Sequence, residues 1–245
     1  MKIRNIIIVV VILIVAGIAL KVFWPSNEFS FAGTLEATKV DLSAQLPSTI
    51  GEVKVREGDH VKAQQELVTL TCEDFKIASQ LAEQNFNRNQ RLFKTGTASQ
   101  DTMDQVVNRK KDTDLRLQWC SIHSPIDGLI LSRYHEPGEW VNPGLKLLTL
   151  ANIKDIWTYI YVPQAEVSKL SLGMKLKGYV PEIPNRTFEG TIIKINAEAE
   201  FTPKNVQTQS ERTRLVFGIK VSFLGSNEDE ILKPGMTIEM RIAKE

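Results

Sequence analysis

Two stretches of the chain repeat each other, and this repeat constrains the possible folds more than any other feature. Residues 50–70 (IGEVKVREGDHVKAQQELVTL) and residues 126–150 (IDGLILSRYHEPGEWVNPGLKLLTL) align without a gap over their last thirteen positions. Gly58 falls opposite Gly138, and glycine supplies the positive φ that a tight turn needs. Alternating apolar residues on both sides of each turn predict short β-strands. We expect the two copies to close on each other as one small β-sandwich.

A segment with helix-forming composition separates the two copies. Between Cys72 and Cys120 lie 47 residues with one glycine, Gly96, and no proline. Because glycine and proline are the least favourable residues inside a helix, this composition predicts two helices with the turn at Gly96. The insert is therefore expected to be an antiparallel hairpin in which the numbers of facing residues add to about 192. The glycines that we assign to structural turns are Gly51, Gly58, Gly96, Gly128 and Gly138.

The facing surfaces of the two predicted helices become polar toward the turn. Phe75 faces Leu117 near the base, whereas Asn85 and Asn89 lie in the half near the turn. Such a pair of helices is weak by itself, because most helix stability in proteins comes from packing an apolar face. We expect the tip of the hairpin to pack against something else.

The N-terminal segment predicts a membrane anchor. Residues 6–24 form an apolar stretch interrupted only by Lys21, and a helix of this length spans about 28 Å. Lys2 and Arg4 precede the stretch and favour a cytoplasmic N-terminus, which places the rest of the chain outside the cytoplasm. A cleaved signal peptide is the alternative, because residues 17–19 (GIA) suit a cleavage site.

The two cysteines lie symmetrically about Gly96, at the base of the predicted hairpin. Cys72 and Cys120 add to 192, the value for facing residues, and the predicted anchor places both in an oxidising compartment. We hypothesise a disulfide that clamps the base of the hairpin. The alternative is a pair of small buried thiols that fill the junction.

The C-terminal third of the chain predicts a small β-barrel. Five runs of alternating apolar residues follow residue 150, and regularly spaced short strands are typical of barrels. Residues 163–170 (PQAEVSKL) favour a short helix ended by Gly173. Residues 201–212 are mostly polar and favour a long loop, with a docking role or none.

The order of these segments resembles the membrane fusion proteins of Gram-negative export systems, also called periplasmic adaptor subunits or the hemolysin secretion protein D family. The split repeat looks like biotinyl and lipoyl domains, and HSPIDGLI (residues 123–130) is similar to the family's second-half signature. FTPKNVQTQSERTRLVFGIKV (residues 201–221) and LKPGM (residues 232–236) are similar to the C-terminal barrel of adaptors that serve ABC-type exporters. The resemblance covers nearly the whole chain, from Phe31 onward.

A further resemblance lies near the predicted hairpin tip. Arg88, Leu92 and Ser99 give the spacing Arg-x3-Leu-x6-Ser, which is similar to the motif by which hairpins of this family dock on an outer-membrane duct. The resemblance therefore implies that these three residues contact the duct. The helices look shorter than is common in the family.

The resemblance also implies the location and the partners of the chain. It implies an inner-membrane protein with a single-pass anchor at residues 6–24 and its bulk in the periplasm of a Gram-negative bacterium. The implied partners are an inner-membrane transporter, with an ABC permease favoured, an outer-membrane efflux duct for small molecules or drugs, and further copies of the chain in a ring. Two alternatives stay open: a periplasmic scaffold or binding protein that never contacts a duct, and a biotin or lipoyl carrier, which would need an exposed lysine between the copies.

Composition excludes several other classes of protein. Thirty basic and 29 acidic residues leave a formal net charge of +1, which gives no support to a nucleic-acid partner. Two cysteines and three scattered histidines form no recognisable metal-binding set. Motifs of a nucleophile elbow or a phosphate-binding loop are also missing from the sequence. We therefore expect no enzyme activity, no cofactor and no metal.

The expected fold class is α+β, elongated and multi-domain. It combines a split lipoyl-like or biotinyl-like β-sandwich, an inserted α-helical hairpin, a C-terminal β-barrel and an N-terminal transmembrane helix. The expected parts are residues 1–25 (cytoplasmic tip and anchor), 26–71 (N-terminal strands and first half of the sandwich), 72–120 (hairpin), 121–150 (second half) and 151–245 (barrel and C-terminal strands).

Overall fold

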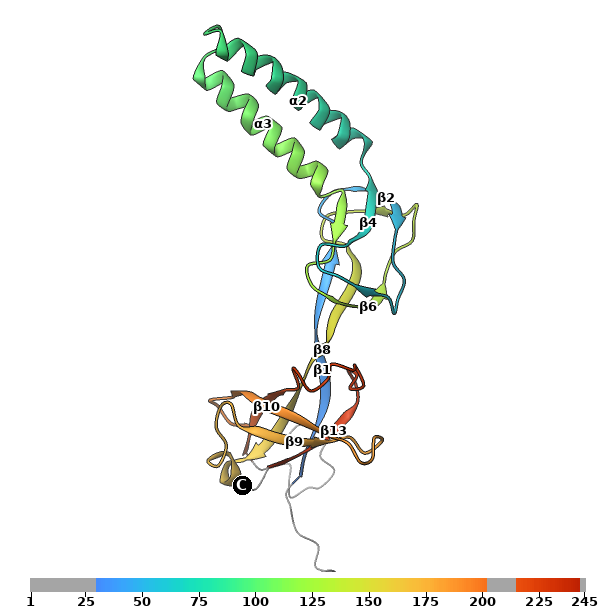
Figure 1. Cartoon of the computed structure of the whole chain (residues 1–245), viewed down its shortest axis with the longest axis vertical. Helices are drawn as coiled ribbons and strands as arrows, with labels where there is room; N and C mark the ends of the chain where they lie inside the picture. The colour runs from blue at the N-terminus through green and yellow to red at the C-terminus, as the bar shows by residue number, and fades with distance from the viewer. Residues whose placement is uncertain (1–29, 202–214, 243–245) are drawn as a thin grey trace, which may run out of the picture. The chain divides into compact units, whose positions relative to one another are not determined.

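A computed structural model describes residues 30–201 and 215–242, which are mostly β-structure with two long helices (Figure 1). The anchor predicted at residues 6–24 and most of the loop predicted at residues 201–212 lie outside the described residues. Within the described ranges, no helix is long and apolar enough to cross a membrane.

Thirteen strands and three helices follow one another along the described residues. The first half of the chain holds β1 (Ser30–Ser43), β2 (Ser48–Val53), β3 (His60–Val61), β4 (Glu66–Thr71), α2 (Glu73–Lys94), α3 (Gln100–Gln118) and β5 (Ser121–His123). The second half holds β6 (Gly128–Arg133), β7 (Trp140–Val141), β8 (Lys146–Pro163), α4 (Gln164–Val167), β9 (Lys175–Tyr179), β10 (Thr187–Ile195), β11 (Glu200–Phe201), β12 (Leu215–Ser222) and β13 (Thr237–Ile242).

The two copies of the repeat are interlocked by equivalent backbone hydrogen bonds. Gly58 N donates to Ile130 O at 2.9 Å, and the matching Gly138 N donates to Ile50 O at 2.8 Å. In both cases the turn of one copy binds a strand of the other copy. The sheet β5-β4-β2-β7 accordingly takes strands from both copies, and β3 pairs with β6 in the other sheet. Neither copy is complete alone, and together they form what we call the repeat module.

One buried apolar cluster fills the repeat module, and matching positions of the two copies contribute equally to it. The strand alternation seen in the sequence turns these residues inward, where burial of apolar surface stabilises the fold. The matched buried pairs are Val61 with Val141, Leu67 with Leu147, Val68 with Leu148, and Leu70 with Leu150. The repeat in the sequence is therefore a repeat of core positions.

Two of the five glycines assigned to turns lie inside strands instead. Gly51 is in β2 and Gly128 begins β6. A Cβ on Gly128 would lie 2.6 Å from Ala151 O, and one on Gly51 would lie 3.2 Å from Thr69 O. A Cβ at Gly128 would therefore clash with the neighbouring strand, whereas one at Gly51 would only be tight. The position of both glycines in strands corrects their assignment to turns. The three remaining glycines have positive φ, namely Gly58 (89°), Gly96 (72°) and Gly138 (91°).

The repeat predicts one stabilising substitution. Gln64 (φ 66°) and Gly144 (φ 85°) are equivalent, and their N–H groups donate to Ser124 O and Ala44 O, which lie in the segments that precede the other copy. Left-handed backbone disfavours a residue with a Cβ, an effect only partly offset by the greater freedom of unfolded glycine. We therefore expect Gln64→Gly to raise the free energy of unfolding by roughly 0.5–1 kcal/mol in urea denaturation. Gln65→Gly is the control, because Gln65 has no positive φ, and it should lower that free energy. A Gln64→Gly variant with unchanged or lower stability would show that the left-handed backbone at Gln64 is not strained.

Six strands close into a β-barrel. Their order is β12-β10-β9-β13-β1-β8, and β12 also pairs with β8, which completes the circle (Figure 1). Strand β10 shows the alternation that a barrel needs, since Phe188 and Ile192 are buried whereas Glu189 and Ile193 are exposed. The helix predicted at residues 163–170 is present as the single turn α4.

Strand β8 runs unbroken from Lys146 to Pro163, so the domain boundary expected after residue 150 falls inside one strand. Two compact units result. One unit is formed by residues 34–159 and 220–236, and the other by the described residues before 34, residues 160–219 and those from 237 onward. Residues 220–236 thus belong to the unit of the repeat module, although they lie in the C-terminal third of the sequence.

Candidate docking surface of the helical hairpin

Helices α2 and α3 lie side by side and run in opposite directions (Figure 1). Helix α2 ends at Lys94, and Gly96 N and Thr97 N donate back to carbonyl oxygens in its last turn. The positive φ of Gly96 allows this reversal. Ser99 then begins the second helix, because its Oγ accepts a hydrogen bond from Thr102 N at 3.1 Å.

The contact surface between the two helices is held by a polar network. Lys110 Nζ lies 2.5 Å from Glu83 Oε2 on the other helix and 2.6 Å from Asp114 Oδ2. Asp114 Oδ1 in turn accepts a hydrogen bond from Ser79 Oγ at 2.7 Å. Little apolar surface supports this network, since the buried residues of the two helices are Ser79, Ala82 and Thr113.

The network fixes which residues face each other. The hydrogen bond from Lys110, together with that from Ser79, lowers the pKa of Asp114, and the hydrogen bonds to Asp114 and Glu83 raise the pKa of Lys110. Both groups therefore remain charged over a wide pH range. Partly exposed ion pairs contribute little stability, so their main effect is on register. Both cross-helix pairs add to 193, one more than the value expected from the midpoint.

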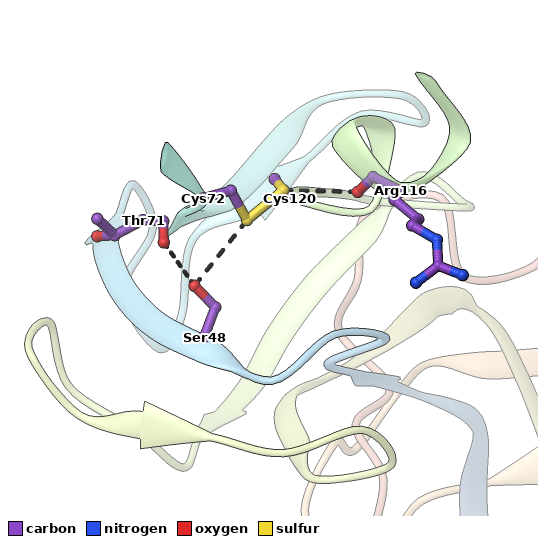
Figure 2. The surroundings of a disulfide bond; sticks show 5 residues. All are labelled: Ser48, Thr71, Cys72, Arg116 and Cys120. Atoms are coloured by element: carbon purple, nitrogen blue, oxygen red, sulfur yellow. Dashed lines mark hydrogen bonds between the residues drawn. A yellow bond between two sulfur atoms is a disulfide. The ribbon is translucent and has the colours of Figure 1, made fainter. Parts of the chain in front are cut away.

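A disulfide joins Cys72 and Cys120 at the base of the hairpin (Figure 2). Their Cα atoms are 6.1 Å apart, and Cys72 precedes α2 directly. Ser48 of strand β2 lies next to the bond, and its Oγ donates to Thr71 O at 2.7 Å. Both cysteines belong to the buried cluster of the repeat module. The bond therefore fastens the hairpin to the core of the module.

Apolar packing supports the same end of the hairpin. Phe75 in the first turn of α2 and Leu117 in the last turn of α3 pack against the core cluster. Among the described apolar residues of the hairpin, Trp119, which follows α3, is the one other that packs against that cluster. The base is thus held by a covalent bond and by burial, whereas the remaining length depends on the polar network.

The face of α2 that points away from α3 exposes large apolar side chains. Ile77, Leu81 and Leu92 are 63%, 57% and 41% exposed. Together with Arg88 they follow helical spacing along one face, and we call these four residues the α2 stripe. Arg88 Nη2 donates to Asn85 Oδ1 at 2.6 Å within the same helix. Exposed apolar surface is typical of interaction sites, so this face is a candidate contact surface.

The three residues of the predicted docking motif do not lie on one surface. Arg88 and Leu92 lie together on the exposed stripe near the turn. Ser99 lies across the turn from them, and its hydroxyl is engaged in starting α3. Ile77 and Leu81 were missed from the sequence because only the facing surface of the hairpin was considered. Their spacing from Arg88 was the available signal.

A pocket lies beside the hairpin base, and its one aspartate, Asp41, already forms an ion pair and a hydrogen bond within the chain. It has a volume of about 340 Å³ and is lined by the end of β1, the end of α3 and strand β5. Asp41 in this pocket accepts from Lys146 Nζ at 2.7 Å and from Thr149 Oγ1 at 2.5 Å. Across the residues that the structure describes, no three His, Cys, Asp or Glu side chains come together as a metal site. The α2 stripe is therefore the strongest candidate for a functional surface.

Comparisons with known proteins agree with this architecture. Residues 155–245 match the family described as the CusB-like β-barrel domain. A chimeric MacA–MexA protein with the Pseudomonas aeruginosa MexA α-hairpin domain has a TM-score of 0.70 at 17% identity, over 88% of this chain and 81% of that one. The membrane fusion protein Spr0693 of Streptococcus pneumoniae R6 has a TM-score of 0.64 at 16% identity, over 89% and 99%. The chain therefore has the fold of these two proteins, and its C-terminal residues match a CusB-like β-barrel domain. The family resemblance found in the sequence is thereby confirmed.

Curated relatives of the chain are named as membrane proteins. A UPF0194 membrane protein of Citrobacter koseri is 30% identical over 159 residues, which are 62% of this chain and 47% of that protein. A UPF0194 membrane protein of Acidithiobacillus ferridurans is 35% identical over 134 residues, or 55% and 38% of the two chains. The chain thus spans half or less of the length of these relatives.

Proposed function

We propose that the chain is a periplasmic adaptor that connects an inner-membrane exporter to an outer-membrane efflux duct for small molecules or drugs. The observation that supports this best is the hairpin, which is fixed firmly at its base and carries the exposed α2 stripe toward its tip. A hairpin held mainly by polar contacts is a weak structure alone, so partners that cover the stripe would stabilise it. The stripe ends at Arg88 and Leu92, the residues proposed to meet the duct.

The membrane side of the adaptor is proposed from the N-terminus and the barrel. Residues 6–24 would anchor the chain in the inner membrane, and the curated relatives are themselves named membrane proteins. An ABC permease is the favoured transporter, because β12 and residues 232–236 lie in the segments that resemble adaptors of ABC-type exporters. Energy for export would come from that transporter.

A periplasmic scaffold that never contacts a duct is the second candidate. Its support is Ser99, whose hydroxyl caps α3 and is therefore less available for a partner. A biotin or lipoyl carrier gains no such support, since the hairpin stands where a carrier has the turn with its modified lysine. The two candidates that remain differ in one partner, the outer-membrane duct.

Isolation of the complex from whole cells separates these two candidates. We expect a tagged chain, crosslinked in intact cells and purified under denaturing conditions, to carry both an inner-membrane transporter and an outer-membrane protein. Mass spectrometry of the adducts identifies both proteins. A transporter without any outer-membrane protein would favour the scaffold, and adducts with neither would reject the adaptor function altogether.

A further inference from the structure

The barrel exposes a second apolar surface, at one of its ends. Leu172 is 67% exposed on the turn between α4 and β9, and Ile193 is 51% exposed near the end of β10. Two backbone hydrogen bonds join these segments, from Gly173 N to Ile192 O at 2.8 Å and from Ile192 N to Met174 O at 2.9 Å. Leu172 and Ile193 are therefore carried by neighbouring segments at the same end of the barrel.

Lysines lie close to these apolar residues in the same two segments. Lys194 follows Ile193 directly, and Lys175 and Lys177 are exposed at the start of β9. Lys175 is paired with Glu189 Oε1 at 2.6 Å. In the described part of the chain, neither Lys177 nor Lys194 has an ion pair or a side-chain hydrogen bond. Exposed apolar residues beside unpaired lysines match the chemistry of an interface with anionic phospholipids.

The predicted anchor reaches the same end of the barrel. Strands β1 and β8 are antiparallel with Leu35 opposite Thr158, and five residues further on Ser30 is level with Pro163. Pro163 leads into α4 and then into the exposed turn. Only residues 25–29 join Ser30 to the stretch predicted to span the membrane. An extended chain covers at most about 3.5 Å per residue, so Ser30 lies within roughly 20 Å of the bilayer.

We propose that this end of the barrel rests directly on the bilayer surface. Leu172 and Ile193 enter the headgroup region, and Lys177 and Lys194 bind anionic phospholipid headgroups. The contact rests on the proposed function in one respect, since it uses the anchor at residues 6–24. The occupant is the lipid surface itself, and contact with the transporter is the competing outcome of the test.

A fluorescent probe on the full chain tests the contact in the absence of any transporter. The chain is reconstituted into vesicles of phosphatidylcholine with or without phosphatidylglycerol, and a nitrobenzoxadiazole probe is attached to Leu172→Cys. The native cysteines are bonded to each other, so the probe labels one site. Leu224→Cys is the matched control, because Leu224 is also 67% exposed but belongs to the other unit.

We expect the probe at position 172 to shift to shorter wavelength in vesicles with phosphatidylglycerol, less without it, and to shift back at high salt. The probe at position 224 should show none of these changes. Lys194→Gln should lower the ratio of docked to free barrel about fivefold, since one lysine near an anionic surface has an effect of that size. Lys233→Gln, an exposed lysine of the other unit, should leave the ratio unchanged.

Three results would overturn the contact while the anchor stands. They are vesicles that float with the chain but give no shift at position 172, equal shifts at positions 172 and 224, and a shift that appears only after a transporter is added. A chain that fails to float with vesicles would reject the anchor of the proposed function as well. The failure of the contact and the failure of the anchor are thus distinguished by flotation.

Discussion

Replacing both Cys72 and Cys120 by alanine is expected to lower the free energy of unfolding of the hairpin by about 4 kcal/mol. The bond closes a loop with a sequence separation of 48, and without it the unfolded chain gains the entropy of that open loop. The folded hairpin has little to compensate, because its buried residues are small or polar. The loss should therefore appear as early melting of the two helices.

Helical circular dichroism during urea denaturation measures this effect selectively. Among the described residues, helices α2 and α3 dominate the helical signal, since α4 has only four residues. The oxidised wild type should melt at a higher urea concentration than the double alanine variant, and reductant should shift the wild type alone. Equal midpoints for the oxidised and variant proteins would show that packing of Phe75 and Leu117 holds the base without the bond.

Aspartate at both Ile77 and Leu81 is expected to abolish self-association of the chain. Burying an exposed leucine or isoleucine contributes about 1.5–3 kcal/mol, so two of them account for more than a hundredfold in the association constant. Placing two carboxylates in the contact adds a desolvation cost. In the proposed ring every copy would use the same contact, so the loss would be repeated around the ring.

The mass of the membrane-reconstituted chain measures this prediction. Wild type should form higher oligomers at concentrations where Ile77→Asp with Leu81→Asp stays monomeric. Gln80→Asp with Asn87→Asp is the matched control, because it adds the same charge to exposed polar positions of the same helix. Oligomers that survive in the stripe variant would mean that the copies meet through another surface.

The parts of the fold that could be predicted depend on local patterns. Alternating apolar residues and matched glycines define the repeat, and the absence of proline from residues 73–119 defines the hairpin. The position of the cysteines followed from symmetry about Gly96, although the observed facing pairs add to 193. Each of these features can be predicted from residues close together in the sequence, or from the symmetry of the hairpin about Gly96.

The parts that were missed depend on contacts between distant residues. Asn152 and Asp155 are common turn residues, yet β8 continues through them because it pairs with β1, more than a hundred residues away. Asn227 looks like a loop residue in sequence, yet it is buried and its side chain bonds Ile153 O at 2.8 Å and Leu232 N at 2.8 Å. These bonds hold residues 220–236 in the unit of the repeat module.

The candidate site also combines features that the sequence predicts with features that it does not. Arg88 and Leu92 were found from a motif, and the structure places both on an exposed face. Ser99 fits two roles, because serine is common both at helix starts and in the docking motif, and the structure shows it at the start of α3. Glycine likewise has two roles that the sequence does not distinguish. Gly128 avoids a clash with Ala151, whereas Gly138 adopts positive φ in a turn.

A photocrosslink from the hairpin tip tests the proposed bridge between the two membranes most directly. A photoreactive residue in place of Leu92, activated in intact cells, is predicted to form an adduct with an outer-membrane protein. Arg88→Asp should remove this adduct, whereas Lys76→Asp, with the same charge change near the base of α2, should keep it, and circular dichroism should be unchanged in both. Adducts only with inner-membrane proteins or with further copies of the chain, while the transporter is bound, would contradict the bridge.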